Sequence, residues 1–165
     1  MIFHIFQDWS ANSGSPKGRF VLAFFRICQV VRGLPGGVWI LGAPVLAAYV
    51  LVVHWILGIE LDYKTAVGSG LSLRHGVGLV VHRNVVIGAG CTLRQGVTIG
   101  ERRGDGRCPL LEDGVEIGAN AVLLGPVRIG QHSVIGAGAI VLHDIEAFTV
   151  VAGNPAVVIK RLNTP

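Results

Sequence analysis

An aliphatic residue returns at every sixth position through most of the stretch from Val67 to Val141, and a small or β-branched residue usually stands four positions later. A period of six fits neither the turn of an α-helix, about 3.6 residues, nor the alternation of a long strand. It is typical of a solenoid of short strands that each point one aliphatic side chain inward. The repeat therefore predicts an all-β solenoid whose coils stack on one another. The repeated positions are Val67, Leu73, Leu79, Ile87, Leu93, Ile99, Leu111, Ile117, Leu123, Ile129, Ile135 and Val141.

Two breaks interrupt this repeat. Between Leu79 and Ile87 the phase slips by two residues, which predicts an irregular corner at His82–Val86. Val77, four positions after a repeated aliphatic residue, is expected to point inward. The stretch Glu101–Cys108 has no aliphatic residue but three Arg and two Gly, and it is predicted to form a loop outside the coil. A polar loop at the rim of a rigid scaffold is a usual place for ligand contacts.

Composition limits the classes of partner. Hydrophobic residues make up 51% of the chain and charged residues 15%, so we expect other copies of the chain, another partner or a membrane to cover apolar surface. The net charge of +4 comes from dispersed basic residues, which argues against nucleic-acid binding. Cys28, Cys91 and Cys108 are odd in number and lie in unlike contexts, which favours a reducing cytoplasm without disulfides. No metal-ligand spacing occurs, so no structural zinc is expected.

Residues 1–59 are expected to form a helical segment that precedes the solenoid. Ser15 and Pro16 are suited to the N-cap and first position of a helix, and Gly33 follows its last basic residue. The helix over Lys17–Arg32 is predicted to be amphipathic and basic. One interpretation is a helix that packs against the coil, and the other is a helix at an anionic membrane surface.

The apolar run Val38–Leu57 is long enough, at about 1.5 Å per residue, to cross a hydrocarbon core of about 30 Å. Pro44 is expected to kink such a helix, and His54 would be costly at bilayer depth. We therefore favour burial in an oligomer or attachment to the membrane surface over a true span. The run starts too late for a cleavable signal. The predicted organisation is a helical segment 1–59, a β-helix 60–145 with a loop at 101–108, and a tail 146–165.

Three motifs resemble the serine O-acetyltransferase family. They are the stretch Ile59–Val77, the loop end Arg107–Pro109 and the tail segment Ala152–Ala156. The resemblance covers about two thirds of the chain and is strongest to short acetyltransferases of exopolysaccharide and colanic acid biosynthesis. It implies a left-handed parallel β-helix, an exception to the right-handed crossover rule. It also implies a homotrimer with active sites between neighbouring coils, and acetyl-CoA as the acetyl donor without a metal.

The resemblance assigns the catalytic base to His75 and its acidic partner to Glu60, fifteen positions earlier. The pairing is chemically reasonable, because a neutral alcohol attacks a thioester slowly unless a base removes its proton. Histidine, with an unperturbed pKa of about 6.5, suits this task. A carboxylate would orient the imidazole and stabilise the imidazolium that forms. Stacked coils of about eighteen residues would bring the two side chains together.

The chain also departs from the serine enzymes. Arg74 stands where that family has an Asp for the substrate ammonium, and Cys108 replaces a second His. Arg107, which would meet a carboxylate, is kept. A cation facing the ammonium group of L-serine would cost on the order of 2 to 5 kcal/mol. These three residues are therefore expected to bind the hydroxyl substrate, preferably a sugar. Cys108 is not expected to be a nucleophile, because direct transfer needs no covalent intermediate.

The acetyl-CoA site is placed by matching positions. Gly100, Ala119 and Ala137 are expected to lie along the pantetheine arm, where small residues allow close approach. The tail turn Gly153, Asn154 and Pro155 would lie near the adenine and phosphates. Lys160 and Arg161 are candidate partners of the CoA phosphates, or form a solvated basic tail.

The sequence therefore favours an O-acetyltransferase that acts on a saccharide of an exopolysaccharide or of its lipid-linked precursor, at the cytoplasmic face of the inner membrane. The alternative enzyme is a serine O-acetyltransferase. The alternative outside the acetyltransferases is a non-catalytic trimeric scaffold or a zinc protein similar to the γ-carbonic anhydrases. The zinc protein is disfavoured because the repeat from Val67 to Val141 offers only His75, His82 and His132, at unmatched spacing.

Overall fold

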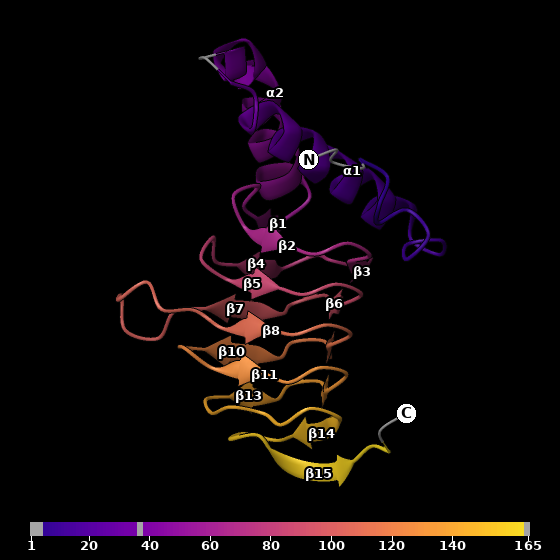
Figure 1. Cartoon of the computed structure of the whole chain (residues 1–165), viewed down its shortest axis with the longest axis vertical. Helices are drawn as coiled ribbons and strands as arrows, with labels where there is room; N and C mark the ends of the chain where they lie inside the picture. Colours follow the sequence, from indigo (N-terminus) through magenta and orange to yellow (C-terminus); the bar gives the residue numbers. More distant parts are fainter. Residues whose placement is uncertain (1–4, 36–37, 164–165) are drawn as a thin grey trace.

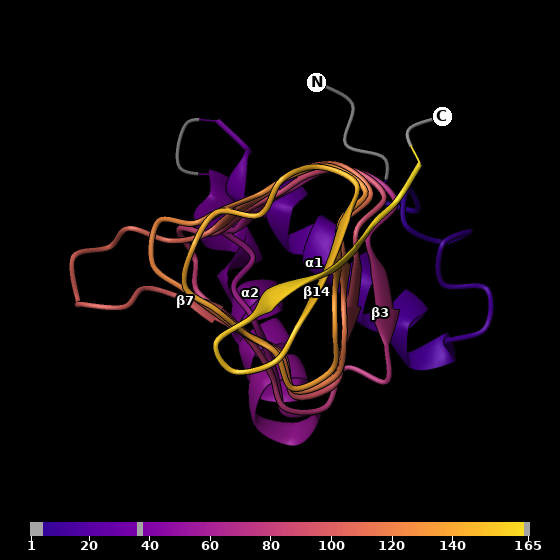
Figure 2. The same cartoon turned by 90° about the horizontal axis from the view of Figure 1, so that it is seen from below.

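The structure is a computed structural model that describes residues 5–35 and 38–163. Its short strands stack as parallel coils along one long axis, with the helices at one end and the last strand, β15 (Val157–Arg161), at the other (Figure 1). Viewed along that axis, the coils share one outline, and a single loop projects far from it (Figure 2). The predicted all-β solenoid, a left-handed parallel β-helix with an N-terminal helical segment, is confirmed.

The strands form three sheets, one on each side of the coil. Sheet A has the order β1-β4-β7-β10-β13, sheet B the order β11-β8-β5-β2, and sheet C the order β15-β14-β12-β9-β6-β3. All pairings are parallel except that of β14 with β15. The strands are β1 (Ile59–Leu61), β2 (Ala66–Val67), β3 (Ser72–Arg74), β4 (Leu79–Val81), β5 (Val86–Ile87), β6 (Thr92–Arg94), β7 (Thr98–Gly100), β8 (Leu110–Leu111), β9 (Glu116–Ile117), β10 (Val122–Leu124), β11 (Arg128–Ile129), β12 (Val134–Ile135), β13 (Ile140–Val141), β14 (Thr149–Ala152) and β15 (Val157–Arg161).

Columns of aliphatic side chains fill the solenoid. In sheet C, Leu73, Leu93, Ile117, Ile135 and Val151 occupy matching positions on successive coils, and all are buried. Each of these side chains is removed from water mainly by the coils on either side, so the burial energy belongs to the stack rather than to one coil.

The extra two residues of the second coil do not lie where the sequence predicted. Val81 pairs with Leu61 and Ile99, so the repeat runs regularly from Val81 to Ile87. The irregular corner is therefore 75–78, between Leu73 and Val81, and not His82–Val86. The prediction for Val77 was also wrong, because this side chain is 57% exposed. Leu79 and Val81 are both buried on β4, so the sequence alone could not show which of them continues the six-residue repeat.

Helix α1 (Pro16–Arg32) begins and ends as predicted. The Ser15 hydroxyl accepts a hydrogen bond from the Gly18 N–H at 3.1 Å, and Gly33 caps the other end. An apolar face packs towards the coils. It consists of the buried residues Val21, Leu22, Phe25 and Cys28.

The apolar run after α1 forms three short helical elements instead of one helix. They are the 3₁₀-helix η1 (Val38–Gly42), the helix α2 (Ala43–Tyr49) and the π-helix η2 (Val50–Ile56). Pro44 lies in the first turn of α2, so it begins a helix where a kink was expected. Within residues 5–35 and 38–163, no helix is both long and apolar enough to cross a membrane.

A buried polar network joins the N-terminal segment to the first coil. The Arg26 guanidinium donates to Asp8 Oδ2 at 2.8 Å and to the carbonyl oxygens of Val67 and Gly68 at 2.9 and 2.6 Å. The Leu71 N–H donates to Asp8 Oδ1 at 2.9 Å. The N-terminal segment and α1 are thereby fixed on the first coil.

Candidate functional site

His75 lies at the widened corner between sheets C and A. Its φ is +68°, a left-handed conformation that costs free energy for a non-glycine residue, and Gly76 and Gly78 at the same corner also have positive φ. Two tight hydrogen bonds shape the corner, from Gly76 N to Arg74 O at 2.9 Å and from Val77 N to His75 O at 3.0 Å. The imidazole is exposed. The two extra residues of this coil thus hold a histidine outside the stack.

A hollow of about 300 Å³ lies beside His75. Arg74 at the end of β3 and Lys17 in the first turn of α1 line it together with the histidine. Arg74 Nε donates to Ser72 Oγ at 3.2 Å, and Lys17 Nζ lies 3.5 Å from Leu57 O. The remaining lining residues are Gly14, Ser15 and Pro16. The sequence indicated Arg74 and His75 but not Lys17, which reaches them only because α1 docks on the first coil.

Glu60 lies on β1 and is exposed, but it lines a different hollow of about 250 Å³ together with His54, Asp62 and His82. Although both residues are described, the structure records no hydrogen bond between Glu60 and His75. The predicted catalytic pair is therefore not formed in the single chain and stays a prediction.

The loop between β7 and β8 carries the other two predicted acceptor residues. Arg107 pairs with Asp105 on the same loop at 2.8 Å, and both side chains reach solvent. Cys108 Sγ lies 3.1 Å from Nδ1 of His82, which was not predicted as part of a site. The Asn84 N–H donates to the same nitrogen at 3.2 Å.

The surroundings of Cys108 disfavour its thiolate form. Partial burial raises its pKa, and the nearby Glu101 and Asp105 carboxylates raise it further. A thiol of this kind is a weak nucleophile, because the thiolate is the reactive species. The raised pKa agrees with the expectation that Cys108 is not the nucleophile.

Two of the residues predicted for acetyl-CoA lie on the same edge as His75. Backbone hydrogen bonds connect this corner from coil to coil: Gly96 N to Val77 O, Asn120 N to Gln95 O, and Gly138 N to Ala119 O. Ala119 and Ala137 therefore follow His75 along one edge of small residues. The turn at Gly153, Asn154 and Pro155 lies at the end of this edge, since Ile140 N donates to Gly153 O at 2.9 Å.

The other predicted cofactor residues lie elsewhere. Gly100 ends β7 and lies on the far side of sheet A, at the corner from which the loop departs. Lys160 and Arg161 lie on β15, and Arg161 is paired with Glu146, whose carboxylate raises the arginine pKa. Among the described residues, no group of three or more His, Cys, Asp or Glu side chains is arranged to hold a metal ion.

Two family models match the coils. Residues 109–143 match the bacterial transferase hexapeptide model of six repeats, and residues 78–102 match the hexapeptide repeat of succinyl-transferase.

Similar proteins include named acetyltransferases. A protein of Escherichia coli strain K12 named as a colanic acid biosynthesis acetyltransferase, WcaB, is 33% identical over 91% of this chain and 95% of its own length. The serine acetyltransferase of Buchnera aphidicola, subspecies Schizaphis graminum, is also 33% identical, over 88% of this chain but only 55% of its own length. A serine acetyltransferase solved in complex with CoA has a TM-score of 0.73 and 27% identity, over 92% of this chain and 60% of its own. The chain is an acetyltransferase and belongs to the hexapeptide-repeat acetyltransferase family.

Proposed function

We propose that this acetyltransferase transfers the acetyl group of acetyl-CoA to a hydroxyl of a saccharide in exopolysaccharide biosynthesis. The observation that carries the proposal is the pair of cations, Arg74 and Lys17, in the hollow that contains His75. Like charges in a shared site repel, so this hollow disfavours an ammonium substrate such as L-serine. A sugar hydroxyl needs no ammonium partner.

In the proposed mechanism His75 is the general base. As the sugar oxygen attacks the thioester carbonyl, its proton passes to the imidazole. General base catalysis of this kind typically makes a reaction about 10² to 10⁴-fold faster. The carbon–sulfur bond then breaks, and the CoA sulfur takes the proton from the imidazolium. The acetyl ester and free CoA leave. Glu60 is proposed to stabilise the imidazolium, which requires its carboxylate to turn towards His75 or to meet it in an assembly.

A homotrimer is proposed because the two groups of predicted site residues lie far apart within a single chain. His75 and the loop with Arg107 lie at opposite corners of sheet A, whose three-residue strands alone span about 10 Å. In a ring of copies, the loop corner of one chain can face the His75 edge of the next. The same arrangement would bring Gly100 of one chain towards Ala119 and Ala137 of its neighbour, with acetyl-CoA between them.

An acceptor assay tests this function. Release of CoA thiol from acetyl-CoA is measured with L-serine and with a panel of neutral and acidic sugars, using the wild-type chain and His75→Ala. We expect transfer to a sugar, slow reaction with L-serine and no transfer by the variant. L-serine is the one second candidate, since relatives carry the name serine acetyltransferase. A wild-type preference for L-serine would replace our proposal with that function.

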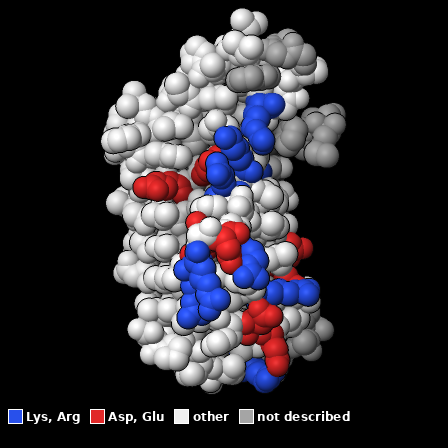
Figure 3. All heavy atoms as spheres, turned by 90° about the vertical axis from the view of Figure 1, so that its left-hand side faces the viewer, with Lys and Arg blue, Asp and Glu red and all other residues white. Residues whose placement is uncertain are grey.

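We further propose that the helical end rests on an anionic bilayer at the cytoplasmic face of the inner membrane, where a lipid-linked acceptor would be concentrated. Residues 9–59 contain no Asp or Glu. On the face seen in Figure 3, charged side chains gather over the coils while most of the helical end is uncharged. Large apolar side chains reach solvent there, among them Leu41 and Trp55, at 82% and 81% exposure.

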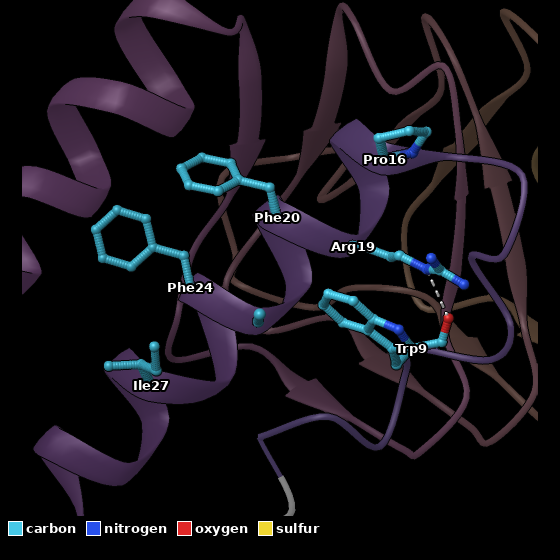
Figure 4. A pocket seen from close by; sticks show the side chains of 7 residues that line it. Trp9, Pro16, Arg19, Phe20, Phe24 and Ile27 are labelled. Atoms are coloured by element: carbon cyan, nitrogen blue, oxygen red, sulfur yellow. Dashed lines mark hydrogen bonds between the residues drawn. The ribbon is translucent and has the colours of Figure 1, made fainter.

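An apolar hollow of about 430 Å³ on α1 adds to this surface (Figure 4). Phe20, Phe24 and Ile27 line it, and Arg19 closes one side, with its guanidinium 4.8 Å from the Trp9 ring centre. Basic residues near an anionic surface contribute about 1 kcal/mol each, and buried apolar area adds to this.

Vesicle flotation tests the attachment. We expect the chain to float with vesicles containing phosphatidylglycerol, to be partly released by high salt, and to bind neutral vesicles weakly. Trp55→Ser should weaken flotation, whereas Val158→Ser, an exposed apolar residue at the other end of the solenoid, should not. No flotation with anionic vesicles would refute the attachment without touching the acetyltransferase proposal. Resistance to both salt and carbonate would indicate a deeper insertion than we propose.

A further inference from the structure

We infer that the hollow beside His75 recognises an anionic group of the acceptor, a sugar carboxylate or a phosphate, through Lys17 and Arg74. The inference rests on the proposed function, because it names the class of saccharide that this site would acetylate.

The two cations converge from separate elements. Lys17 comes from the first turn of α1 and Arg74 from the end of β3, and no acidic residue lines the hollow between them. The carboxylate that precedes α1, Asp8, is buried and bonded to Arg26, so it does not neutralise either cation. The hollow is therefore a positively charged site on a surface of modest net charge.

Neither cation is committed to an internal partner. Arg26, Arg107, Arg128 and Arg161 each form an ion pair, but none of the described ion pairs includes Lys17 or Arg74. Arg74 uses only Nε for Ser72 Oγ, so its terminal nitrogens are available. The Lys17 ammonium has one long contact of 3.5 Å with a carbonyl oxygen. A planar guanidinium and an ammonium together match the oxygens of a carboxylate or phosphate.

The two cations lie beside the proposed catalytic base, so an anion bound there would position the acceptor for acetyl transfer. His75 lines the same hollow as both cations. An anionic group held by them would fix the sugar ring next to the imidazole, and a hydroxyl held within reach of a base reacts as if at high effective concentration. The anion would also favour the imidazolium that forms during transfer. A neutral sugar would lack this anchor, and the ammonium group of an amine would find no acidic partner in the hollow.

Arg94 provides a matched control. It lies in register with Arg74 on the next coil, at the same strand position, and it is exposed, but it does not line the hollow. Arg74→Gln and Arg94→Gln therefore remove the same charge from nearly the same place, and only the first removes it from the proposed site.

Calorimetric titration of the full chain tests the inference without requiring turnover. The probes are methyl β-D-glucuronide, glucose 1-phosphate and the neutral methyl β-D-glucoside. We expect at least one anionic probe to bind about tenfold more tightly than the glucoside, as charge-assisted hydrogen bonds in a partly exposed site allow. Arg74→Gln and Lys17→Gln should each lose most of this preference, and Arg94→Gln should keep it. Which anionic probe is preferred distinguishes a carboxylate from a phosphate.

Equal affinity for the charged and neutral probes, no binding of any probe, or an equal loss in Arg94→Gln would overturn the inference. The acetylation assay separates it from the proposed function. Transfer to neutral and acidic sugars at equal rates would overturn the charge preference alone. Charge-selective binding without acetylation of any sugar would refute the proposed function but leave the anion site in place. An unchanged KM for acetyl-CoA in Arg74→Gln would show that the anion is not part of CoA.

Discussion

Arg26→Met should destabilise the chain more than any other single loss of a cation on α1. The guanidinium is 2% exposed and bonds to the Asp8 carboxylate and to the carbonyl oxygens of Val67 and Gly68. Methionine fills similar volume but leaves the buried Asp8 carboxylate without its cation and the two partly buried carbonyl groups without their guanidinium donor. Breaking a buried ion pair from one side costs about 3 to 5 kcal/mol, so the free energy of unfolding should fall by this amount.

Urea unfolding followed by circular dichroism, at one fixed protein concentration, measures the change. The concentration must be held because assembly would add to the apparent stability. Arg32→Met is the control, since this exposed arginine at the end of the same helix should cost no more than about 1 kcal/mol. The double variant Asp8→Asn, Arg26→Met should recover part of the loss, because no charge is then left buried. A cost for Arg26→Met equal to that of the control would refute the reasoning.

Three further predictions concern the chemistry. His75→Ala should lower turnover by about 10² to 10⁴-fold while assembly and CoA binding persist, and retention of more than about a tenth of the activity would exclude it as the base. Glu60→Gln keeps a hydrogen-bonding group but loses the charge, so we expect a smaller fall in kcat; a loss as large as that of His75→Ala, or no loss, would argue against the proposed support. Iodoacetamide at pH 8, followed by mass spectrometry, should label the native thiols more slowly than free cysteine, because burial raises the pKa of Cys28 to about 12 and of Cys91 to about 11, and that of Cys108 is also raised. Labelling should accelerate as pH rises and more thiolate forms, with the partly exposed Cys108 reacting first.

The repeat was readable from the sequence because every coil must place an aliphatic side chain inward at the same phase. The position of the irregular corner was not, for a specific reason. Two six-residue frames, one containing Leu79 and the other Val81, overlap on β4, and both residues are buried. Only the pairing of Val81 with Leu61 and Ile99 shows that the second frame has already begun there. Periodicity alone cannot supply this register.

The candidate site was predictable in part. His75 and Arg74 stood out through the family resemblance, and Ser15 and Pro16 marked the start of α1. Lys17 could not be associated with them, because no local pattern relates residues so far apart in the chain. Their proximity depends on the buried contacts of Asp8, Asn12 and Arg26 with the first coil, which are tertiary interactions between polar side chains and backbone groups. Such contacts leave no periodic signal.

The two interruptions of the regular coil coincide with the two groups of proposed functional residues. A regular coil offers only inward side chains, which are needed for stacking, and outward side chains on flat strands. The two additional residues at corner 75–78 place His75 outside the stack, and the loop between β7 and β8 places Arg107 outside it in the same way. After the corner at 75–78, the edge that continues through Ala119 and Ala137 stays regular, and its small residues let an extended molecule approach the backbone. A long, flexible acetyl donor is suited to that regular edge, whereas we propose that the acceptor is held at the irregular corner, where the helical segment adds Lys17. That addition depends on docking. The buried Asp8–Arg26 pair lies within the N-terminal segment, and its side chains bond to backbone groups of Val67, Gly68 and Leu71, so the helix that carries Lys17 is held on the first coil.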